Sequence, residues 1–286
     1  MYPAKFEYHR ASSVAEALDL LAQNEDAKLL AGGHSLLPMM KMRLAQPATI
    51  IDIGRISELS GISRANGSVR IGALTRHVDI AESEELADSC PLVAEAAAEI
   101  GDPQVRNRGT IGGNIAHADP ASDLPAVILV LGGTVISVSK SGEKATPASD
   151  FFVDLLTTTL GEDEILTAVE VPVLAAGTGS CYLKFEHPAS GYAVVGAAAV
   201  VSLGADGKCE SASLCFNGVT ATPLVADVSG LAGSAADDAA IDQAVEAGVA
   251  AEDPLGDVFA SGEYRVHVAK VFGKRALKAA RDRASS

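Results

Sequence analysis

LLAGGHSLLPMM, residues 29–40, joins two apolar runs through a pair of glycines. The first run favours a short buried strand, because it is apolar and ends abruptly at the glycines. The second run, SLLPMMKMRL (35–44), predicts a helix with Ser35 as its N-cap and Pro38 in its first turn. We therefore expect a strand, a bare two-glycine turn and a helix in succession.

The two glycines, Gly32 and Gly33, leave backbone uncovered. Because glycine has no Cβ, a ligand can lie directly against its N–H group, and unpaired N–H groups before a helix favour phosphate. The hydroxyl of Ser35 adds a further donor. The pattern is neither G-x-G-x-x-G nor a G-K-[ST] phosphate loop, so a tight turn without a ligand is the alternative interpretation.

A second glycine pair, Gly112 and Gly113, lies in RNRGTIGGNIAHADPASD (106–123). Two such pairs in one domain suggest two loops on opposite sides of one elongated anion, and a pyrophosphate fits this description. Thr110 and Asn114 flank the second pair and could hydrogen-bond the anion's oxygens. Both glycine segments together favour a phosphate-bearing ligand over a plain turn.

Asp123 follows thirteen positions after Thr110. A carboxylate is a poor neighbour for phosphate but a good acceptor for ribose or ribityl hydroxyls. Aspartate is also favoured in the first turn of a helix, and LPAVILVLG (124–132) predicts a helix here. The two roles of this carboxylate are compatible with each other.

Length and charge exclude several classes of protein. The chain has 286 residues, which is comfortable for two domains, and 48% hydrophobic residues, which allows sizeable cores. Aromatic residues make up only 4%, so these cores must consist of Ala, Val, Leu and Ile. The formal net charge of −15 repels nucleic acid and anionic lipid, so neither is expected as a partner.

Cysteine usage and the absence of long apolar runs point to a cytoplasmic protein. No cysteine belongs to a C-x-x-C pair or to a zinc-like cluster, so we expect free thiols and no metal site. The four are Cys90, Cys181, Cys209 and Cys215. MYPAKFEYHR (1–10) has no apolar core of a signal peptide, and the longest apolar stretch, 192–203, is too short to be a transmembrane segment.

The order of predicted elements changes along the chain. Residues 1–54 predict a helix–strand–helix–strand unit, and the small, uncharged AAGTGS (175–180) is the best linker candidate. Beyond it, three strand-like stretches precede two helices near 236–250 and 264–283. We therefore expect the chain to divide near residue 175.

The two glycine segments, AGGHSLLPMMKMRLAQP (31–47) and RGTIGGNIAHADPASDLPA (108–126), resemble the FAD-binding signatures of the medium, flavin-carrying subunits of molybdenum hydroxylases. The likeness runs from YPAKFEYHRASSVAEALDLL (2–21) to the last helix. It implies an α+β protein with a two-subdomain FAD-binding fold of the p-cresol methylhydroxylase type, followed by a C-terminal α+β domain that covers the flavin. The implied boundaries are 1–174 for the FAD-binding domain, with subdomains 1–54 and 55–174, and 178–286 for the C-terminal domain.

The resemblance also assigns roles to individual residues. Residues from both glycine segments would line the diphosphate of FAD: Ala31, Gly32, Gly33, His34, Ser35, Thr110, Gly112, Gly113 and Asn114. Asp123 would hold the ribityl chain. Lys28, Leu29 and Ile100 would lie on the adenine side.

A third segment, KFEHPASGYAVVGAAA (184–199), would approach the isoalloxazine. The resemblance places Tyr192 beside the ring and Lys184 nearby, although a strand aromatic filling a core is the alternative for Tyr192. His34 would be a loop residue near a noncovalently bound flavin. For the other histidines a satisfied structural role is expected: His9, His77, His117, His187 and His267.

The implied function is electron transfer without substrate oxidation by this chain, which carries no catalytic residue of its own. A large partner subunit would hold the molybdenum cofactor and a small one two [2Fe–2S] clusters. Such clusters are bound by groups of cysteines, and the cysteines of this chain form no such group. Carbon monoxide is the expected substrate of the complex, and an N-heterocycle or an aldehyde is the alternative substrate. A quinone or another respiratory component is the expected electron acceptor. The complex would be a heterohexamer, a dimer of heterotrimers, at most peripheral at the inner face of the membrane. A stand-alone FAD-binding protein and a ligand-free structural domain are the readings from other classes.

Overall fold

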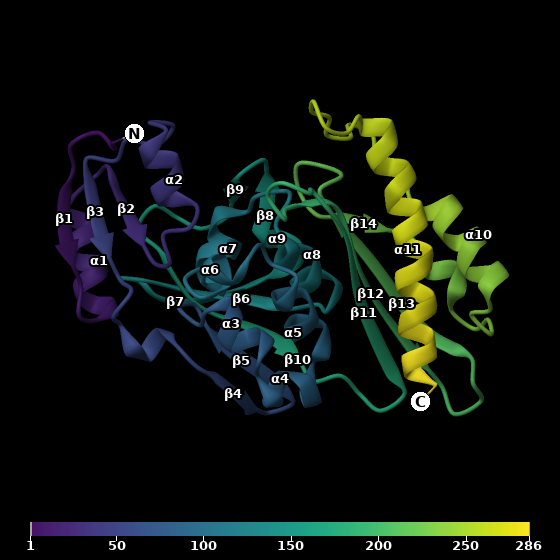
Figure 1. The fold of residues 1–286 in the computed structure, drawn as a ribbon. Coiled ribbons are helices and arrows are strands. Elements are labelled where there is room, and N and C mark those ends of the chain that lie inside the picture. Colours follow the sequence, from purple (N-terminus) through teal and green to yellow (C-terminus); the bar gives the residue numbers. More distant parts are fainter. Residues whose placement is uncertain (1, 286) are drawn as a thin grey trace.

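The computed structural model describes residues 2–285, which form an N-terminal unit, a middle unit and a C-terminal unit in chain order (Figure 1). The N-terminal unit is a parallel sheet with the order β1-β3-β2, to which helices α1 and α2 are connected. Its elements are β1 (Glu7–Arg10), α1 (Val14–Gln23), β2 (Ala27–Leu30), α2 (Leu36–Lys41) and β3 (Thr49–Asp52). The predicted helix–strand–helix–strand order is confirmed, with β1 added before it.

The middle unit is built on a five-stranded antiparallel sheet with the order β4-β5-β10-β6-β7. Asn66 and Gly67 both have positive φ and form the tight turn between β4 and β5, as an Asn-Gly pair does in hairpins. The strands are β4 (Ile62–Ala65), β5 (Ser68–Gly72), β6 (Thr134–Ser139), β7 (Gly142–Pro147) and β10 (Ile165–Pro172).

Helices and a small two-stranded sheet complete the middle unit. The apolar helices α5 and α8 supply much of its core. The helical segments are η1 (Ser57–Leu59), α3 (His77–Ala81), α4 (Glu84–Ser89), α5 (Pro91–Ala98), α6 (Pro103–Arg106), α7 (Ile111–His117), α8 (Asp123–Val130) and α9 (Ala148–Phe151). The small sheet consists of β8 (Phe152–Asp154) and β9 (Thr157–Thr158).

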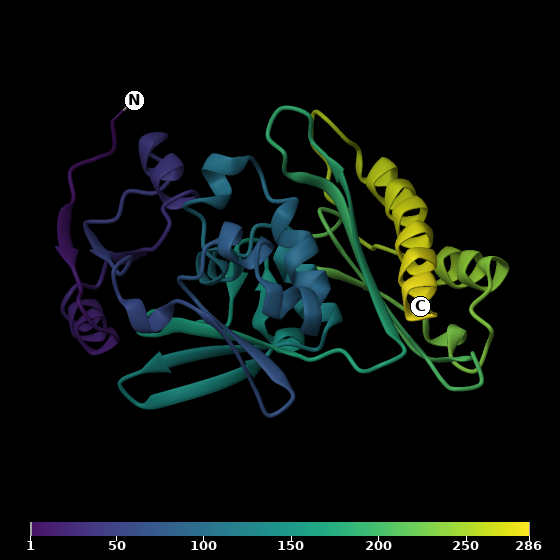
Figure 2. The ribbon, with the colours of Figure 1, turned by 60° about the horizontal axis from the view of Figure 1, so that its bottom comes forward.

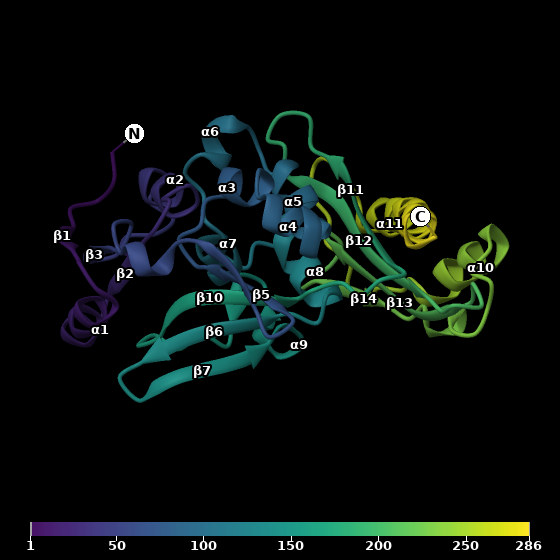
Figure 3. The same cartoon turned by 90° about the horizontal axis from the view of Figure 1, so that it is seen from below.

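The C-terminal unit is a four-stranded antiparallel sheet, β11-β12-β13-β14, followed by helices. One face of this sheet packs on α11 and the other on α5 and α8 of the middle unit, so the sheet lies between the two sets of helices (Figure 3). Its elements are β11 (Thr178–Glu186), β12 (Ala193–Leu203), β13 (Cys209–Asn217), β14 (Leu224–Ala226), η2 (Ser229–Leu231), α10 (Asp238–Gly248) and α11 (Gly262–Ala284).

Strand β11 is an edge strand, and side chains close its free edge. Glu95 of α5 accepts a hydrogen bond from the Tyr182 backbone N–H at 3.0 Å and pairs with Arg283 of α11 at 2.7 Å. Arg283 in turn donates to the carbonyl of Ser180. A single ion pair between the middle and C-terminal units therefore satisfies both a donor and an acceptor of the edge.

Two expectations from the sequence are wrong in detail. The second glycine segment is not a loop, because Ile111–His117 is helix α7 and both glycines lie in its first turn. The predicted linker 175–180 is shorter than expected, because Thr178–Ser180 already belong to β11. In both places local composition favoured flexibility, whereas pairing with distant segments fixed the backbone.

The expected free cysteines are confirmed, and all four are buried. Within residues 2–285, no helix is long and apolar enough to cross a membrane.

Candidate functional site

A cavity of about 500 Å³ opens where the three units meet. Both glycine segments line it, together with the connection from β11 to β12. Of the residues expected in the site, those lining the cavity are Lys28, Leu29, Ala31, Gly32, Gly33, His34, Ser35, Ile100, Thr110, Gly112, Gly113, Asn114, Asp123 and Tyr192. Segments that are far apart in the sequence therefore share one cavity, of a size typical for ligand sites.

The first glycine segment presents free backbone donors. The N–H groups of Gly33, His34 and Ser35 donate to no acceptor within residues 2–285. Gly33 has φ +76°, which a residue with a side chain adopts only with strain. Ser35 occupies the predicted N-cap position of α2, but its hydroxyl makes no capping bond. These donors stay available to a ligand in the cavity.

The second glycine segment has already used its backbone donors. At the start of α7, Ile111 donates to Thr75 at 3.1 Å and Gly112 donates to Ala73 at 2.8 Å. The N–H of Gly113 donates to the Thr110 hydroxyl at 3.2 Å. The segment is therefore docked on the chain that follows β5, and its backbone offers a ligand much less than the first segment does.

Gly112 and Gly32 are required for packing. A Cβ on Gly112 would lie 2.5 Å from the Ala73 Cβ and 2.8 Å from the Ala73 carbonyl oxygen. A Cβ on Gly32 would collide with the carbonyl of Arg108, so the two glycine segments touch at this point. The absence of these side chains lets two chain segments approach each other closely. From the sequence alone, this explanation could not be distinguished from contact with a ligand.

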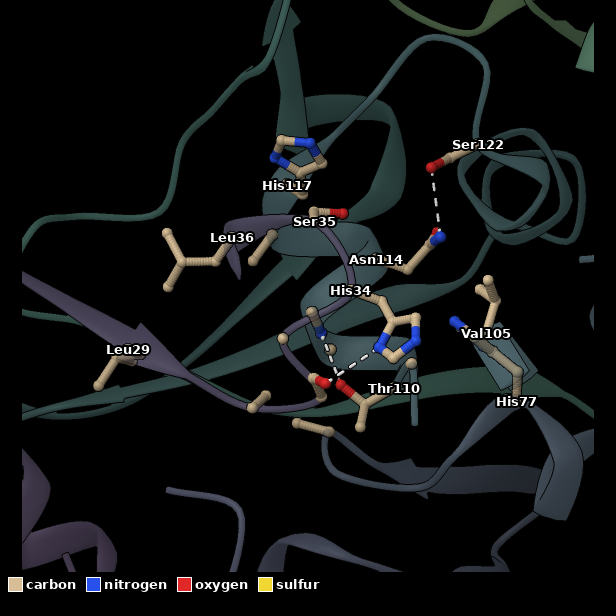
Figure 4. A pocket seen from close by; sticks show the side chains of 18 of the residues that line it. Leu29, His34, Ser35, Leu36, His77, Val105, Thr110, Asn114, His117 and Ser122 are labelled. Atoms are coloured by element: carbon tan, nitrogen blue, oxygen red, sulfur yellow. Dashed lines mark hydrogen bonds between the residues drawn. The ribbon is translucent and has the colours of Figure 1, made fainter. Parts of the chain in front are cut away.

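Polar side chains of the second segment remain partly unpaired at the cavity. Asn114 donates to Ser122 at 3.2 Å, but its buried Oδ1 has no partner within the described chain. Figure 4 shows Thr110 and Asn114 among the residues that line the cavity, with the hydrogen bond from Asn114 to Ser122. This segment thus offers a side-chain acceptor where the first offers backbone donors.

Three histidines line the cavity: His34, His77 and His117. Burial, with a contribution from His34, lowers the pKa of His77 to about 4, so His77 is neutral at pH 7. Its backbone N–H donates to Gly109 at 3.0 Å, whereas its buried Nδ1 has no partner in residues 2–285. The expectation that His77 is a satisfied structural histidine is therefore wrong.

Asp123 begins α8 and is buried, with 4% of its surface exposed. Tyr182 donates to its carboxylate at 2.6 Å, and the Lys184 ammonium lies 3.0 Å from the same oxygen. Burial raises the pKa of Asp123 to about 6, while Lys184 and the hydrogen bond from Tyr182 act in the opposite direction. The expected first-turn position in a helix is confirmed.

Lys184 and Tyr192 differ in exposure and in whether they line the cavity. The Lys184 side chain is 1% exposed and does not line the cavity, because its ammonium is turned to Asp123 and to the carbonyl of Glu99. Tyr192 is 44% exposed and lines the cavity, so the alternative of a core aromatic is wrong. Burial, with the charges of Asp119 and Asp123, raises the pKa of Tyr192.

The sequence did not single out several residues of the site. The cavity is also lined by apolar side chains from α2 and from the region of β9 and β10, and by the two histidines of α3 and α7: Leu36, Met39, Leu156, Leu160, Leu166, His77 and His117. Tyr182 is a further omission, since it holds Asp123 from behind. Only the alternation of Tyr182 and Lys184 along a strand could have indicated that both face the same way.

The cavity fits FAD by its own chemistry. Free N–H groups at Gly33, His34 and Ser35 suit a diphosphate, and apolar side chains at Leu29 and Leu160 suit a ring system. The orphaned Asn114 Oδ1 is an acceptor for a ligand hydroxyl or amine.

Comparison with known proteins agrees with this fit. Residues 4–174 match the family described as the FAD binding domain in molybdopterin dehydrogenase, and residues 180–280 match the CO dehydrogenase flavoprotein C-terminal domain. The chain is 41% identical to the carbon monoxide dehydrogenase medium chain of Hydrogenophaga pseudoflava, covering 98% of both chains.

A second relative and a solved structure are also similar to this chain over nearly its full length. The chain is 37% identical to the alpha subunit of the 6-hydroxypseudooxynicotine dehydrogenase complex of Paenarthrobacter nicotinovorans, covering 99% of this chain and 97% of that one. Its fold matches the solved carbon monoxide dehydrogenase of H. pseudoflava that lacks the Mo-pyranopterin moiety, with a TM-score of 0.95, 42% identity and 99% of each chain covered. The chain therefore belongs to the FAD-binding flavoprotein subunits of the molybdenum hydroxylases, the family that contains the medium chains of carbon monoxide dehydrogenase.

Proposed function

We propose that this chain binds FAD noncovalently in the cavity and is the electron-transfer subunit of a carbon monoxide dehydrogenase complex. The observation that carries the proposal is the convergence of both glycine segments and Tyr192 on one cavity. We retain the division into an FAD-binding domain, 1–174, and a C-terminal domain, 178–286, which the extents of the two family models support.

Residues of this chain would hold the cofactor along its length. The free N–H groups of Gly33, His34 and Ser35 bind the diphosphate, and Ala31, Gly32, Thr110, Gly112, Gly113 and Asn114 enclose it. Lys28, Leu29 and Ile100 lie toward the adenine, and Asp123 accepts from the ribityl hydroxyls. Tyr192 covers the isoalloxazine and limits the access of water, while Lys184 acts from behind Asp123.

Bound FAD supplies the exchange of electrons between the iron–sulfur clusters of a partner subunit and a final acceptor. We propose that a large subunit oxidises carbon monoxide at molybdenum, that a small subunit holds two [2Fe–2S] clusters, and that a quinone accepts the electrons. The complex is a dimer of heterotrimers that lies in the cytoplasm, at most peripherally at the membrane. The chain alone carries no catalytic residue and oxidises no carbon monoxide.

The small subunit docks near Tyr192 in this proposal, because electron transfer slows steeply with distance. Tyr192 is exposed and sits at the end of the β11–β12 connection, which lies beside the segment preceding α11 (Figure 2). There the rings of His187 and Phe259 are 4.2 Å apart, and Phe259 is 43% exposed. Exposed aromatic side chains such as these are typical of protein–protein interfaces.

A different substrate of the complex is the second candidate. The chain is nearly as similar to a subunit of a 6-hydroxypseudooxynicotine dehydrogenase complex as to a carbon monoxide dehydrogenase medium chain. Because the substrate would be oxidised on another subunit, the cavity of this chain does not discriminate between carbon monoxide, an N-heterocycle and an aldehyde.

Purification from the native host tests both the proposed FAD-binding role of the chain and the proposed substrate of the complex. We expect a yellow complex with molybdenum, iron and FAD that reduces an acceptor with carbon monoxide, and an isolated chain that binds FAD without oxidising carbon monoxide. A complex that oxidises only an N-heterocycle or an aldehyde would establish the second candidate. A full chain that takes up no FAD, or that oxidises carbon monoxide alone, would contradict the proposal.

A further inference from the structure

The face of the C-terminal sheet that packs on the middle unit carries a set of polar residues. Side chains alternate along β11, so Cys181, Leu183 and Phe185 pack toward α11. Tyr182 and Lys184 consequently face α5 and α8. Both are almost fully buried, with 4% of Tyr182 and 1% of the Lys184 side chain exposed.

A glycine makes room for these residues. Gly196 of β12 lies opposite Lys184 on one side and opposite Asn217 of β13 on the other. A Cβ on Gly196 would overlap both the Asn217 Oδ1 and the Tyr182 Oη. The Tyr182 hydroxyl therefore lies over the bare backbone of Gly196, 3.3 Å from the Asn217 Oδ1.

From this position the Tyr182 hydroxyl reaches across the boundary between the two units. It donates to the Asp123 carboxylate at 2.6 Å, and Lys184 lies 3.0 Å from the same oxygen and 3.3 Å from the other. Lys184 also donates to the Glu99 carbonyl at 2.6 Å, next to Ile100 at the cavity wall. Asp123 lines the cavity, whereas Tyr182 and Lys184 do not.

We propose that Tyr182 is a positioning residue for FAD binding, because its hydroxyl, together with Lys184, fixes the Asp123 carboxylate as an ionised acceptor at the cavity wall. The inference rests on the proposed binding of FAD. In this proposal the C-terminal sheet has a second role besides covering the flavin through Tyr192. It determines the position and the ionised state of Asp123, a residue of the FAD-binding domain.

The charged and titratable surroundings of Asp123 fix the sign of the pH effect. Lys184 and the Tyr182 hydroxyl stabilise the carboxylate, whereas Glu99 beyond α5 destabilises it. Other titratable groups on the elements packed around α8 are Glu95 of α5, which is paired with Arg283, His117 of α7, Asp150 of α9 and the buried thiol of Cys215 of β13. Removing the Tyr182 hydroxyl takes away a stabilising donor, so the pKa of Asp123 must rise above about 6.

The test is the affinity of the full, deflavinated chain for FAD as a function of pH, measured by the quenching of flavin fluorescence. Loss of a hydrogen bond worth about 1.5–3 kcal/mol to the carboxylate leaves a smaller fraction of Asp123 ionised, so Tyr182→Phe should weaken FAD about two- to tenfold at pH 7. The affinity of the variant should also begin to fall at a higher pH than that of the wild type. Comparison of the two proteins at each pH cancels the contribution of every titratable group that they share.

Two further variants keep the test falsifiable. Tyr264→Phe removes a hydroxyl from the same unit at a side chain that is 46% exposed, and it should leave the affinity and its pH profile unchanged. In an Asp123→Asn background, where nothing titrates at this position, Tyr182→Phe should no longer shift the profile. Asn is preferred to Ala at this position, because its side-chain oxygen can still accept a hydrogen bond from the buried Lys184 ammonium.

The outcomes separate this inference from the proposed function. If the wild-type chain binds no FAD, the proposed function fails. If the wild type binds FAD and Tyr182→Phe binds it with the same affinity and pH profile, only the inference fails. A variant that loses thermal stability while retaining both the affinity and the profile would assign Tyr182 a purely structural role and would overturn the proposal.

Discussion

The two glycine segments look alike in the sequence but differ in how they meet the cavity. Around Gly33 the backbone N–H groups are free, φ is positive and the serine hydroxyl makes no capping bond. Around Gly112 the N–H groups are bonded to the chain after β5, and the missing side chain is replaced by Ala73. From Gly33 onward the first segment thus leaves its backbone donors to a ligand, whereas the second segment, like Gly32, serves packing.

This difference shows that a glycine pair beside a helix has two separate physical explanations. One is access, in which backbone N–H groups stay free and uncovered for a ligand. The other is close approach, in which a second part of the chain occupies that space. Substitutions can distinguish the two, because loss of access weakens FAD binding while loss of close approach weakens the fold.

Gly112→Ala should have the largest effect. The new Cβ would lie 2.5 Å from the Ala73 Cβ and 2.8 Å from its carbonyl oxygen, and neither atom can move without the backbone. We expect a loss of about 3 kcal/mol in the free energy of unfolding, measured with denaturant. Gly113→Ala is the matched control, since its Cβ would meet only the Thr110 hydroxyl at 3.0 Å. A Gly112→Ala chain as stable as wild type would remove the distinction between the segments.

His77 tests the packing role of the second segment by pH. Its pKa is lowered from 6.5 to about 4, so the unfolded chain binds more protons between these values and the folded chain loses stability as pH falls through this range. Between pH 7.5 and 5 this amounts to about 2 kcal/mol. His77→Gln should lack this loss in denaturant unfolding at the two pH values.

Asp123 must be considered in the same experiment, because its pKa is raised and its effect has the opposite sign. It is present in both proteins, so the difference between wild type and variant isolates His77. An identical pH dependence in the two proteins would show that His77 is not the group that resists protonation.

Gly33→Ala should lower both the stability of the fold and the affinity for FAD. The φ of +76° costs about 1–2 kcal/mol for a residue with a Cβ, and relief of this strain moves the neighbouring N–H groups. We expect FAD to bind at least tenfold more weakly in a fluorescence titration. Gly132→Ala, at φ +66° and outside the cavity, carries similar backbone strain in open space, whereas a Cβ on Gly33 would in addition meet the Leu37 side chain at 2.9 Å. Weakening of FAD by both variants alike would mean that strain, not the position of the donors, is responsible.

The smallest expected difference between the two segments concerns the hydroxyl groups of Thr110 and Ser35. Thr110 caps α7 by accepting from Gly113, so Thr110→Ala should cost about 1 kcal/mol of unfolding free energy. Ser35 caps nothing, so Ser35→Ala should leave unfolding unchanged and weaken FAD about three- to tenfold, as expected for one hydrogen bond of about 1 kcal/mol. Equal loss of stability in the two variants would contradict the comparison.

Local patterns in the sequence predicted much of this molecule. The apolar run before Gly32 and the first-turn position of Pro38 both determine local structure, and both predictions are confirmed. Residue types also led to the expectation that both glycine segments belong to one site, and both line the same cavity. The segment 184–199 led to the prediction that Tyr192 lies at the site. A single aromatic residue does not indicate whether it is exposed, so its exposure could not be predicted.

Other features depend on contacts between distant segments and could not be predicted. Two adjacent glycines disfavour a helix, yet α7 forms because Thr75 and Ala73 accept its first N–H groups. Strand β7, GEKATP, has no apolar alternation and is recognisable only by its pairing with β6. The hydrogen bond between Tyr182 and Asp123 joins residues 59 positions apart, and nothing in either local sequence indicates it.

The ion pair of Glu95 and Arg283 has a consequence for how the chain can be divided. It is the device that keeps the outer edge of β11 from offering a free row of donors and acceptors. A chain cut in the short connection before Thr178 would separate Glu95 from that edge and uncover the sheet face that α5 and α8 protect. The released half would then aggregate by adding strands from other molecules, as unprotected edges do. Fragments are therefore poor reagents for this protein, and co-expression of both halves is the way to study them.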